Sequence, residues 1–299
     1  MKRALFGFLL AVASTAWAQQ AEPAAARTPA VSAEATPAPT GDGEKAAWPE
    51  AIEDNSFLVE EAYNQEPGVV QWIFGGLYTR PNDLWALSFT NEWPVPAETH
   101  QLSYTASWTG AGRGAPSGLG DLVLNYRYQL CRESKDGVAV APRLSAILPT
   151  GEWRRGLGAG TVGWQVNLPL SKRVSRFLAF HANLGGTYYP GAKSLGPSGK
   201  TLRRDLWGTN EGMSVIWLAA ERFNLMMETV AYQQEQFGEE GAKVRTSQVL
   251  FSPGFRCAFN LPKGQLVLGA AVPVGLTRES PHSGVFLYLS WEAPLWRTK

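Results

Sequence analysis

The chain has 299 residues with 27 Lys and Arg against 26 Asp and Glu, so its formal net charge is +1. This balance gives no bulk reason to expect nucleic acid or another polyanion as a partner. The 31 glycines and 12 tryptophans suit many strands, tight turns and interfacial aromatics better than a helical protein. Cys131 and Cys257 fall on different faces of strands that we place far apart, which predicts two free thiols.

The first residues have the three parts of a secretion signal. Lys2 and Arg3 form a positive n-region, Ala4 to Val12 an apolar h-region, and small residues precede a cleavage site after Ala18. We therefore expect residues 1–18 to be a signal peptide. No later stretch approaches 18 consecutive apolar residues, so no transmembrane helix is expected after processing.

The next segment is rich in Ala and Pro and has no hydrophobic period. Such a segment cannot bury enough apolar surface to offset its ordering entropy, so we interpret residues 19–54 as a disordered periplasmic linker. Residues 48–67 are transitional and carry the acidic pair Glu60 and Glu61. They are expected to tuck under or into the domain that follows, which occupies residues 55–299 with a short lead-in.

That domain is built from strands with one apolar face. In the segment Leu122 to Leu130 every even position is apolar or aromatic, whereas Asn125, Arg127 and Gln129 alternate with them. Lengths near 10 to 12 residues suit tilted membrane strands. We predict twelve strands at about 68–79, 83–93, 99–109, 120–131, 137–148, 160–171, 175–188, 206–219, 222–234, 245–259, 264–275 and 284–294.

The expected connections alternate in length from the third strand onward. Short periplasmic turns and longer external loops produce this alternation in outer-membrane barrels. The long ones are 110–119, 149–159, 189–205, 235–244 and 276–283, and the short ones are 132–136, 172–174, 220–221 and 260–263. The first two connections, 80–82 and 94–98, depart from the rule. The fold class is therefore all-β, a transmembrane antiparallel up-and-down β-barrel of about twelve strands.

Several charged or polar residues should face the interior of this barrel by parity. They are Arg127, Arg143, Glu228, Arg256, His181, Asn125 and Gln165. Arg127 and Arg143 should lie close across adjacent strands, where two guanidiniums repel unless a carboxylate or a solute lies between them. One interpretation is a plug, with Glu228 or acidic residues of the N-terminal segment as partners. The other is a constriction that favours anionic or polar aromatic solutes.

Catalytic and metal sites find little support. The glycines near 112 and 158 do not sit between a strand and a helix, so no nucleotide site is predicted. No pair of the three histidines has metal-ligand spacing, and we expect no metal and no cofactor. A lipid-hydrolysing barrel would need His181 and Asn183 with a serine such as Ser214 or Ser252, none of which is marked as activated. A hydrogen-bonded lumen histidine is favoured, and we expect no enzyme.

Two surface features concern the membrane. Segment 189–205 carries Lys193, Lys200, Arg203 and Arg204, which could meet lipopolysaccharide phosphates or serve only loop solubility. Indole rings favour the membrane–water interface. Several tryptophans fall near predicted strand ends, namely Trp93, Trp108, Trp291 and Trp296.

Three stretches resemble a known family. They are Asn55 to Val70, the Gly120-Asp121 pair followed by the strand to Leu130, and the Leu-Pro-Thr-Gly turn within Ile147 to Gly151. They are similar to the outer-membrane β-barrel family of meta-pathway phenol degradation proteins, often labelled transporters. The resemblance spans roughly 55–299. It implies a barrel that passes aromatic or other small hydrophobic compounds.

Our leading hypothesis is passive passage of an unidentified small molecule through a barrel in the outer membrane of a Gram-negative bacterium. Its partners would be membrane lipids and lipopolysaccharide. Twelve strands lie between filled eight-stranded barrels and open sixteen-stranded porins, so passage would be narrow. The alternatives are a closed barrel with a structural or assembly role, blocked by residues 48–67, and a barrel lipid hydrolase.

Overall fold

The computed structural model describes residues 52, 54–81, 83–112, 115–238 and 241–294. The predicted signal peptide, nearly all of the predicted linker and Trp296 lie outside these residues. Within them, no helix is both long enough and apolar enough to span a membrane.

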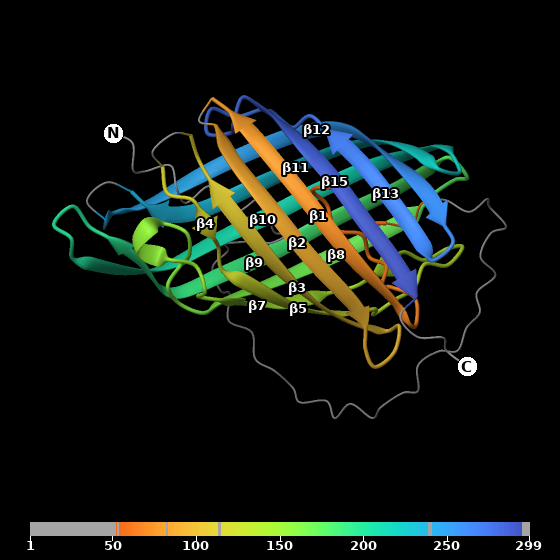
Figure 1. The fold of residues 1–299 in the computed structure, drawn as a ribbon, viewed down its shortest axis with the longest axis horizontal. Coiled ribbons are helices and arrows are strands. Elements are labelled where there is room, and N and C mark those ends of the chain that lie inside the picture. Colours follow the sequence, from red (N-terminus) through yellow and green to blue (C-terminus); the bar gives the residue numbers. More distant parts are fainter. Residues whose placement is uncertain (1–51, 53, 82, 113–114, 239–240, 295–299) are drawn as a thin grey trace.

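Twelve long strands of the described residues form one closed antiparallel barrel (Figure 1). They are β1 (Val69–Arg80), β2 (Leu84–Pro94), β3 (His100–Gly110), β5 (Leu122–Tyr128), β7 (Arg143–Leu148), β8 (Gly163–Arg173), β9 (Leu178–Leu195), β10 (Thr201–Ala220), β11 (Phe223–Phe237), β12 (Lys243–Leu261), β13 (Gly264–Ala271) and β15 (Ser283–Pro294). Short elements extend the wall or cap a loop, namely β4 (Gly118–Leu119), β6 (Ala139–Val140), β14 (Val274–Gly275) and the 3-10 helix η2 (Trp153–Arg155).

Each long strand pairs with its neighbours in chain order, and β1 pairs with β15 to close the ring. Closure removes the two edges that an open sheet would present. The predicted count of twelve strands and the up-and-down order are confirmed. Cys131 and Cys257 are both free among the described residues, as predicted.

The connections fall at two ends, which we call the loop end and the turn end. Of the described residues, 81, 83, 111–112, 115–117, 149–162, 196–200, 238, 241–242 and 276–282 lie at the loop end, and 95–99, 129–138, 174–177, 221–222 and 262–263 lie at the turn end. Because β1 starts at the turn end, the segment before it enters the barrel there.

The prediction of a long loop at 189–205 is wrong. Strands β9 and β10 continue as a paired hairpin through this segment, and only 196–200 form the turn (Figure 1). Lys193 pairs with Arg203 across this hairpin, so most of the predicted basic loop is strand. Backbone pairing does not require an apolar face, so a hairpin can continue after the apolar alternation that marks it in sequence has ended.

The outer face of the barrel is an apolar band. Exposed large apolar side chains occur on strands around the ring, including Leu87, Trp108, Val166, Leu184, Met213, Phe255 and Leu287. Trp93, Trp108 and Trp291 lie near strand ends. An outward apolar band with interfacial aromatics is the arrangement of a transmembrane barrel.

The inner face is polar and densely packed. Gln165 and Thr187 are each 1% exposed although both point inward from the loop-end half of the wall, and Thr109, Gln234 and Gln248 are also buried. A wide aqueous channel would leave such side chains accessible. The inward side chains at these positions are therefore closely covered by their neighbours.

Candidate functional site: the plug segment and the polar wall

Residues 54–65 lie inside the barrel, and we call them the plug segment (Figure 1). They contain no strand, so wall side chains must satisfy their backbone groups. The N–H groups of Leu58 and Val59 donate to Glu228 Oε1 at 2.9 and 3.1 Å. Further along, the N–H of Ala62 donates to Ser171 Oγ at 2.7 Å.

Most of these wall groups belong to one polar row. This row crosses five neighbouring strands, β8 to β12, and each of its residues is the register partner of the next. Its members are Ser171, His181, Ser214, Glu228 and Ser252. Inward residues at the same register stand side by side on the wall. The plug segment runs along this row and covers it.

A second row holds the carboxylate of Glu60. Arg127, Arg143 and Asn167 are register partners on β5, β7 and β8. Arg143 Nε donates to both oxygens of Glu60 at 3.0 and 2.8 Å, Arg127 donates at 3.2 Å, and Asn167 Nδ2 donates at 2.8 Å. We call Arg127, Arg143 and Asn167 the carboxylate site.

Charge decides the ionisation of Glu60. Burial alone would raise its pKa, but the guanidiniums of Arg143 and Arg127 outweigh burial and hold the pKa below its ordinary value. Glu60 is therefore an ionised carboxylate between two cations. It supplies the carboxylate that the adjacent arginines required on sequence grounds.

Arg143 is also held by wall residues on its loop-end side. Its NH1 donates to Asn125 Oδ1 at 2.8 Å and to Gln165 Oε1 at 3.1 Å, and it also contacts Ser145 Oγ. These residues are register partners across β5, β7 and β8. The orientation of Arg143 is thus set by the barrel wall as well as by Glu60.

A third guanidinium binds the start of the plug segment. Arg256 donates to the backbone oxygens of Ile52, Asp54 and Asn55 and to Glu61 Oε1, the last at 3.2 Å. Its side chain is 1% exposed. Arg256 therefore fixes the chain where it enters the described part of the lumen.

The side chain of Asp54 is held by uncharged donors on β1 and β15. Gln71 and Tyr288 donate to its Oδ1 at 2.6 and 2.7 Å, and Ser290 donates to Oδ2. Burial raises the pKa of Asp54, although Arg256 and these hydrogen bonds act in the opposite direction. At this end neutral donors hold the carboxylate, and the guanidinium of Arg256 binds the backbone oxygens.

Packing adds to the hold on this end. The Phe57 ring lies 5.4 and 5.1 Å from the rings of Phe286 and Tyr288. It fits because Gly269 on β13 has no side chain, since a Cβ there would lie 2.3 Å from Phe57 Cζ. Small wall residues are thus needed where the plug segment approaches most closely.

The structure places all seven sequence-predicted lumen residues on the inner wall, each buried. Arg127 and Arg143 donate to Glu60, Asn125 and Gln165 accept from Arg143, and Arg256 donates to Glu61. Sequence reasoning missed Asp54, which it assigned to the linker. It also passed over Asn167 and Ser171 as binding groups, although the parity of the strand around Gln165 marks Asn167 as inward.

His181 lies beside two serines of the wall, Ser171 and Ser214. Its Nδ1 lies 2.7 Å from Ser171 Oγ and its Nε2 lies 3.8 Å from Glu61, whereas serine hydrolases present Nε2 to the hydroxyl. Ser214 faces His181 across the strands, but its hydroxyl lies 3.3 Å from that of Ser56. This is the geometry of a hydrogen-bonded lumen histidine.

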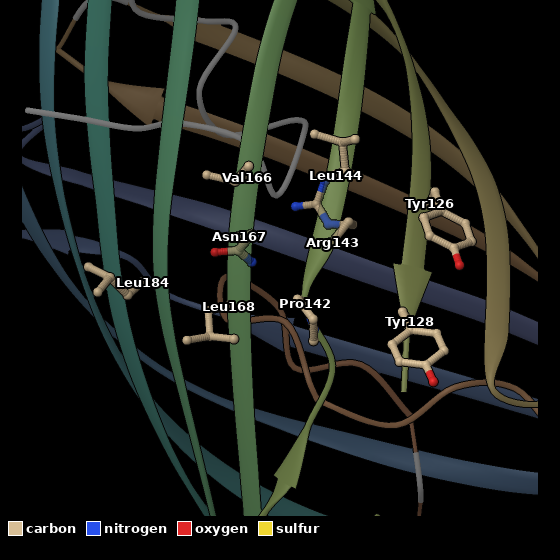
Figure 2. Close-up of a pocket in the computed structure, with 9 residues that line it drawn as sticks. All are labelled: Tyr126, Tyr128, Pro142, Arg143, Leu144, Val166, Asn167, Leu168 and Leu184. Carbon is tan, nitrogen blue, oxygen red and sulfur yellow. The ribbon is translucent and has the colours of Figure 1, made fainter. Parts of the chain in front are cut away.

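A groove of about 480 Å³ lies on the other side of the same wall (Figure 2). Exposed apolar and aromatic side chains of β5, β7, β8 and β9 surround it. Its lining consists of Tyr126, Tyr128, Pro142, Arg143, Leu144, Val166, Asn167, Leu168 and Leu184. The groove is part of the outward apolar band.

No protein-family model matches the sequence, and no curated protein matches it either. Solved structures do. An outer membrane channel from Pseudomonas putida F1 superposes with a TM-score of 0.59 and 13% identity, covering 78% of this chain and 97% of that one. At this identity the likeness establishes the fold alone.

Two further barrels are more distant. The NanC porin gives a TM-score of 0.48 at 9% identity over 75% of this chain and 100% of its own. The CymD monoaromatic hydrocarbon channel gives 0.41 at 12% identity over 78% and 90%. Neither likeness is close enough to indicate a solute for this chain.

Proposed function

We propose that this protein is a channel of the Gram-negative outer membrane that lets small molecules cross passively when its plug segment moves. The observation that carries the proposal is the way the plug segment is held. It occupies the lumen as an irregular chain bound by side-chain hydrogen bonds and ion pairs, and it forms no strand with the wall. Such a segment can leave without breaking the barrel's own backbone ladder.

The outward apolar band supports placement in a membrane, and the basic residues of the β9–β10 hairpin support a lipid partner. Arg203, Arg204 and Lys200 are exposed at the loop end. Lipopolysaccharide phosphates would suit them through charge-assisted hydrogen bonds. For the solute we propose small aromatic or hydrophobic compounds, the class implied by the resemblance of the Gly-Asp and Pro-Thr-Gly elements.

A reversible lock tests whether passage needs motion of the plug segment. Ser56 Oγ and Ser214 Oγ lie 3.3 Å apart, so the pair Ser56→Cys and Ser214→Cys, made with Cys131→Ser and Cys257→Ser, should form a disulfide between plug and wall. Planar-bilayer conductance should be lost on oxidation and restored by reductant. Each single-cysteine variant is the control.

Equal conductance in the oxidised and reduced states would overturn the role of the plug segment. The alternative function is a closed barrel with a structural or assembly role. It predicts that no solute flux accompanies reduction and that growth on a panel of aromatic carbon sources does not depend on the protein. Uptake that requires the reduced pair favours the channel.

A further inference from the structure

The carboxylate site is a receptor formed by the barrel wall. Its three members come from adjacent strands and point their donors at one carboxylate, that of Glu60. Arg143 and Asn167 are direct register partners on β7 and β8, and Figure 2 shows them on these neighbouring strands. The two guanidiniums and the amide give a charged, directional set of donors, which is the pattern that recognises a carboxylate.

Within this receptor, the orientation of Arg143 does not depend on the occupant alone, whereas Arg127 also donates to Asn64 and to backbone oxygens of the plug segment. Asn125, Ser145 and Gln165 hold Arg143 from the wall. Gln165 is fixed in turn by donating to Thr187 Oγ1 at 3.0 Å. A guanidinium held by three wall residues keeps its direction when the group facing it leaves, because the donors are pre-organised.

Removing Glu60 would leave a cationic site that needs a new anion. Arg127 and Arg143 are directly paired across β5 and β7, and both are buried. Like charges in this position are destabilising, and a buried charge without a partner is costly. An anion that enters as the plug segment leaves would relieve both effects.

We propose that Arg127, Arg143 and Asn167 bind the carboxylate group of a small organic solute in exchange with Glu60. The inference rests on the proposed channel function and names the chemical class of its solute. Glu60 occupies the place of the solute carboxylate in the closed barrel. The solute and the plug segment then compete for one set of donors, so binding of one releases the other.

Acetate provides the direct probe in the full chain carrying Glu60→Ala. Calorimetric titration in detergent should show binding of acetate and none of acetamide, its neutral analogue. Adding Arg143→Gln should weaken acetate binding by about tenfold or more, the loss expected for hydrogen bonds to a charged group. Arg256→Gln is the matched control, because this lumen arginine lies outside the site and its loss should not weaken binding.

The natural chain gives a second measurement that does not depend on folding of the variant. Benzoate should accelerate hydrogen exchange of the plug segment by competing with Glu60, and benzyl alcohol should not. Equal binding of acetate and acetamide, acetate binding unaffected by Arg143→Gln, or plug exchange insensitive to benzoate would each overturn the inference. These readouts involve no conductance, so failure of the disulfide lock to block conductance would defeat the channel and leave the site standing.

Discussion

The two ends of the plug segment are held by different chemistry. Glu60 lies as an ion between the guanidiniums of Arg127 and Arg143. Asp54 lies among neutral donors, and the neighbouring Phe57 packs on aromatic rings. One barrel thus holds Glu60 through ion pairs to its carboxylate. Around Asp54 it uses neutral donors to the carboxylate, aromatic packing and the Arg256 guanidinium, which donates to backbone oxygens.

The difference predicts opposite responses to charge. The pKa of Glu60 is lowered by its arginines against the effect of burial, whereas burial raises the pKa of Asp54. The carboxylate between two guanidiniums must stay ionised to form its ion pairs. The buried carboxyl among neutral donors can be protonated with a smaller loss of binding. Changes that remove charge should therefore loosen the Glu60 end first.

The largest effect is expected for Glu60→Ala. Removing one partner of a buried ion pair costs about 3–5 kcal/mol because the remaining charges are left uncompensated. Hydrogen exchange of the amides around residue 60, followed by mass spectrometry, should accelerate strongly while the barrel strands stay protected. Unchanged exchange around residue 60 would mean that the ion pairs do not hold the plug segment.

Acidification should have the next largest effect, and at the same end. A carboxyl with a lowered pKa stabilises the bound plug above its ordinary value of 4.5 and loses that contribution as the pH falls through the lower folded-state value. The contribution of Asp54 to the stability of the bound plug changes with pH in the opposite direction, because its raised pKa favours the protonated form. Exchange around Glu60, corrected for its intrinsic pH dependence, should rise below pH 4.5 and should not do so in Glu60→Gln.

The packing of Phe57 can be disrupted by a substitution that changes no charged residue. Gly269→Ala places a Cβ 2.3 Å from Phe57 Cζ and 2.9 Å from the backbone oxygen of Phe255. The ring must move most and the neighbouring strand slightly, at a cost of about 1–3 kcal/mol for overpacking. Exchange near residue 57 should accelerate more than exchange near residue 60. Gly76→Ala is the control, because its Cβ would meet only Leu87 at 3.4 Å. Equal effects at both ends would show that the segment moves as one unit.

The smallest effect is expected for Asp54→Asn. The amide oxygen can still accept from Gln71 and Tyr288, and the hydroxyl of Ser290 can turn to accept from the new amide. The loss should be about 1 kcal/mol, the net value of a single hydrogen bond. A loosening as large as that of Glu60→Ala would remove the distinction between the two ends.

The wall could be predicted from the sequence because a strand has a period of two. Alternation placed Arg127, Arg143, Glu228 and Arg256 on the inner face, and the short connection after Gln129 placed the first two side by side. The same reasoning failed at 189–205. Charged and glycine-rich residues there continue a hairpin whose pairing depends on backbone groups and leaves no apolar period.

The sequence by itself determined the barrel: its strand number, which face of each strand turns inward and the need for an anion between two arginines. Only the tertiary structure decided which anion this is and the route of the plug segment through the lumen. An irregular segment has no period of its own. Its path is set by wall side chains that bond it. Asn167 donates to Glu60, whereas Asn183 and Ser171 accept from backbone N–H groups, and the strands that carry these residues come together only when the ring closes.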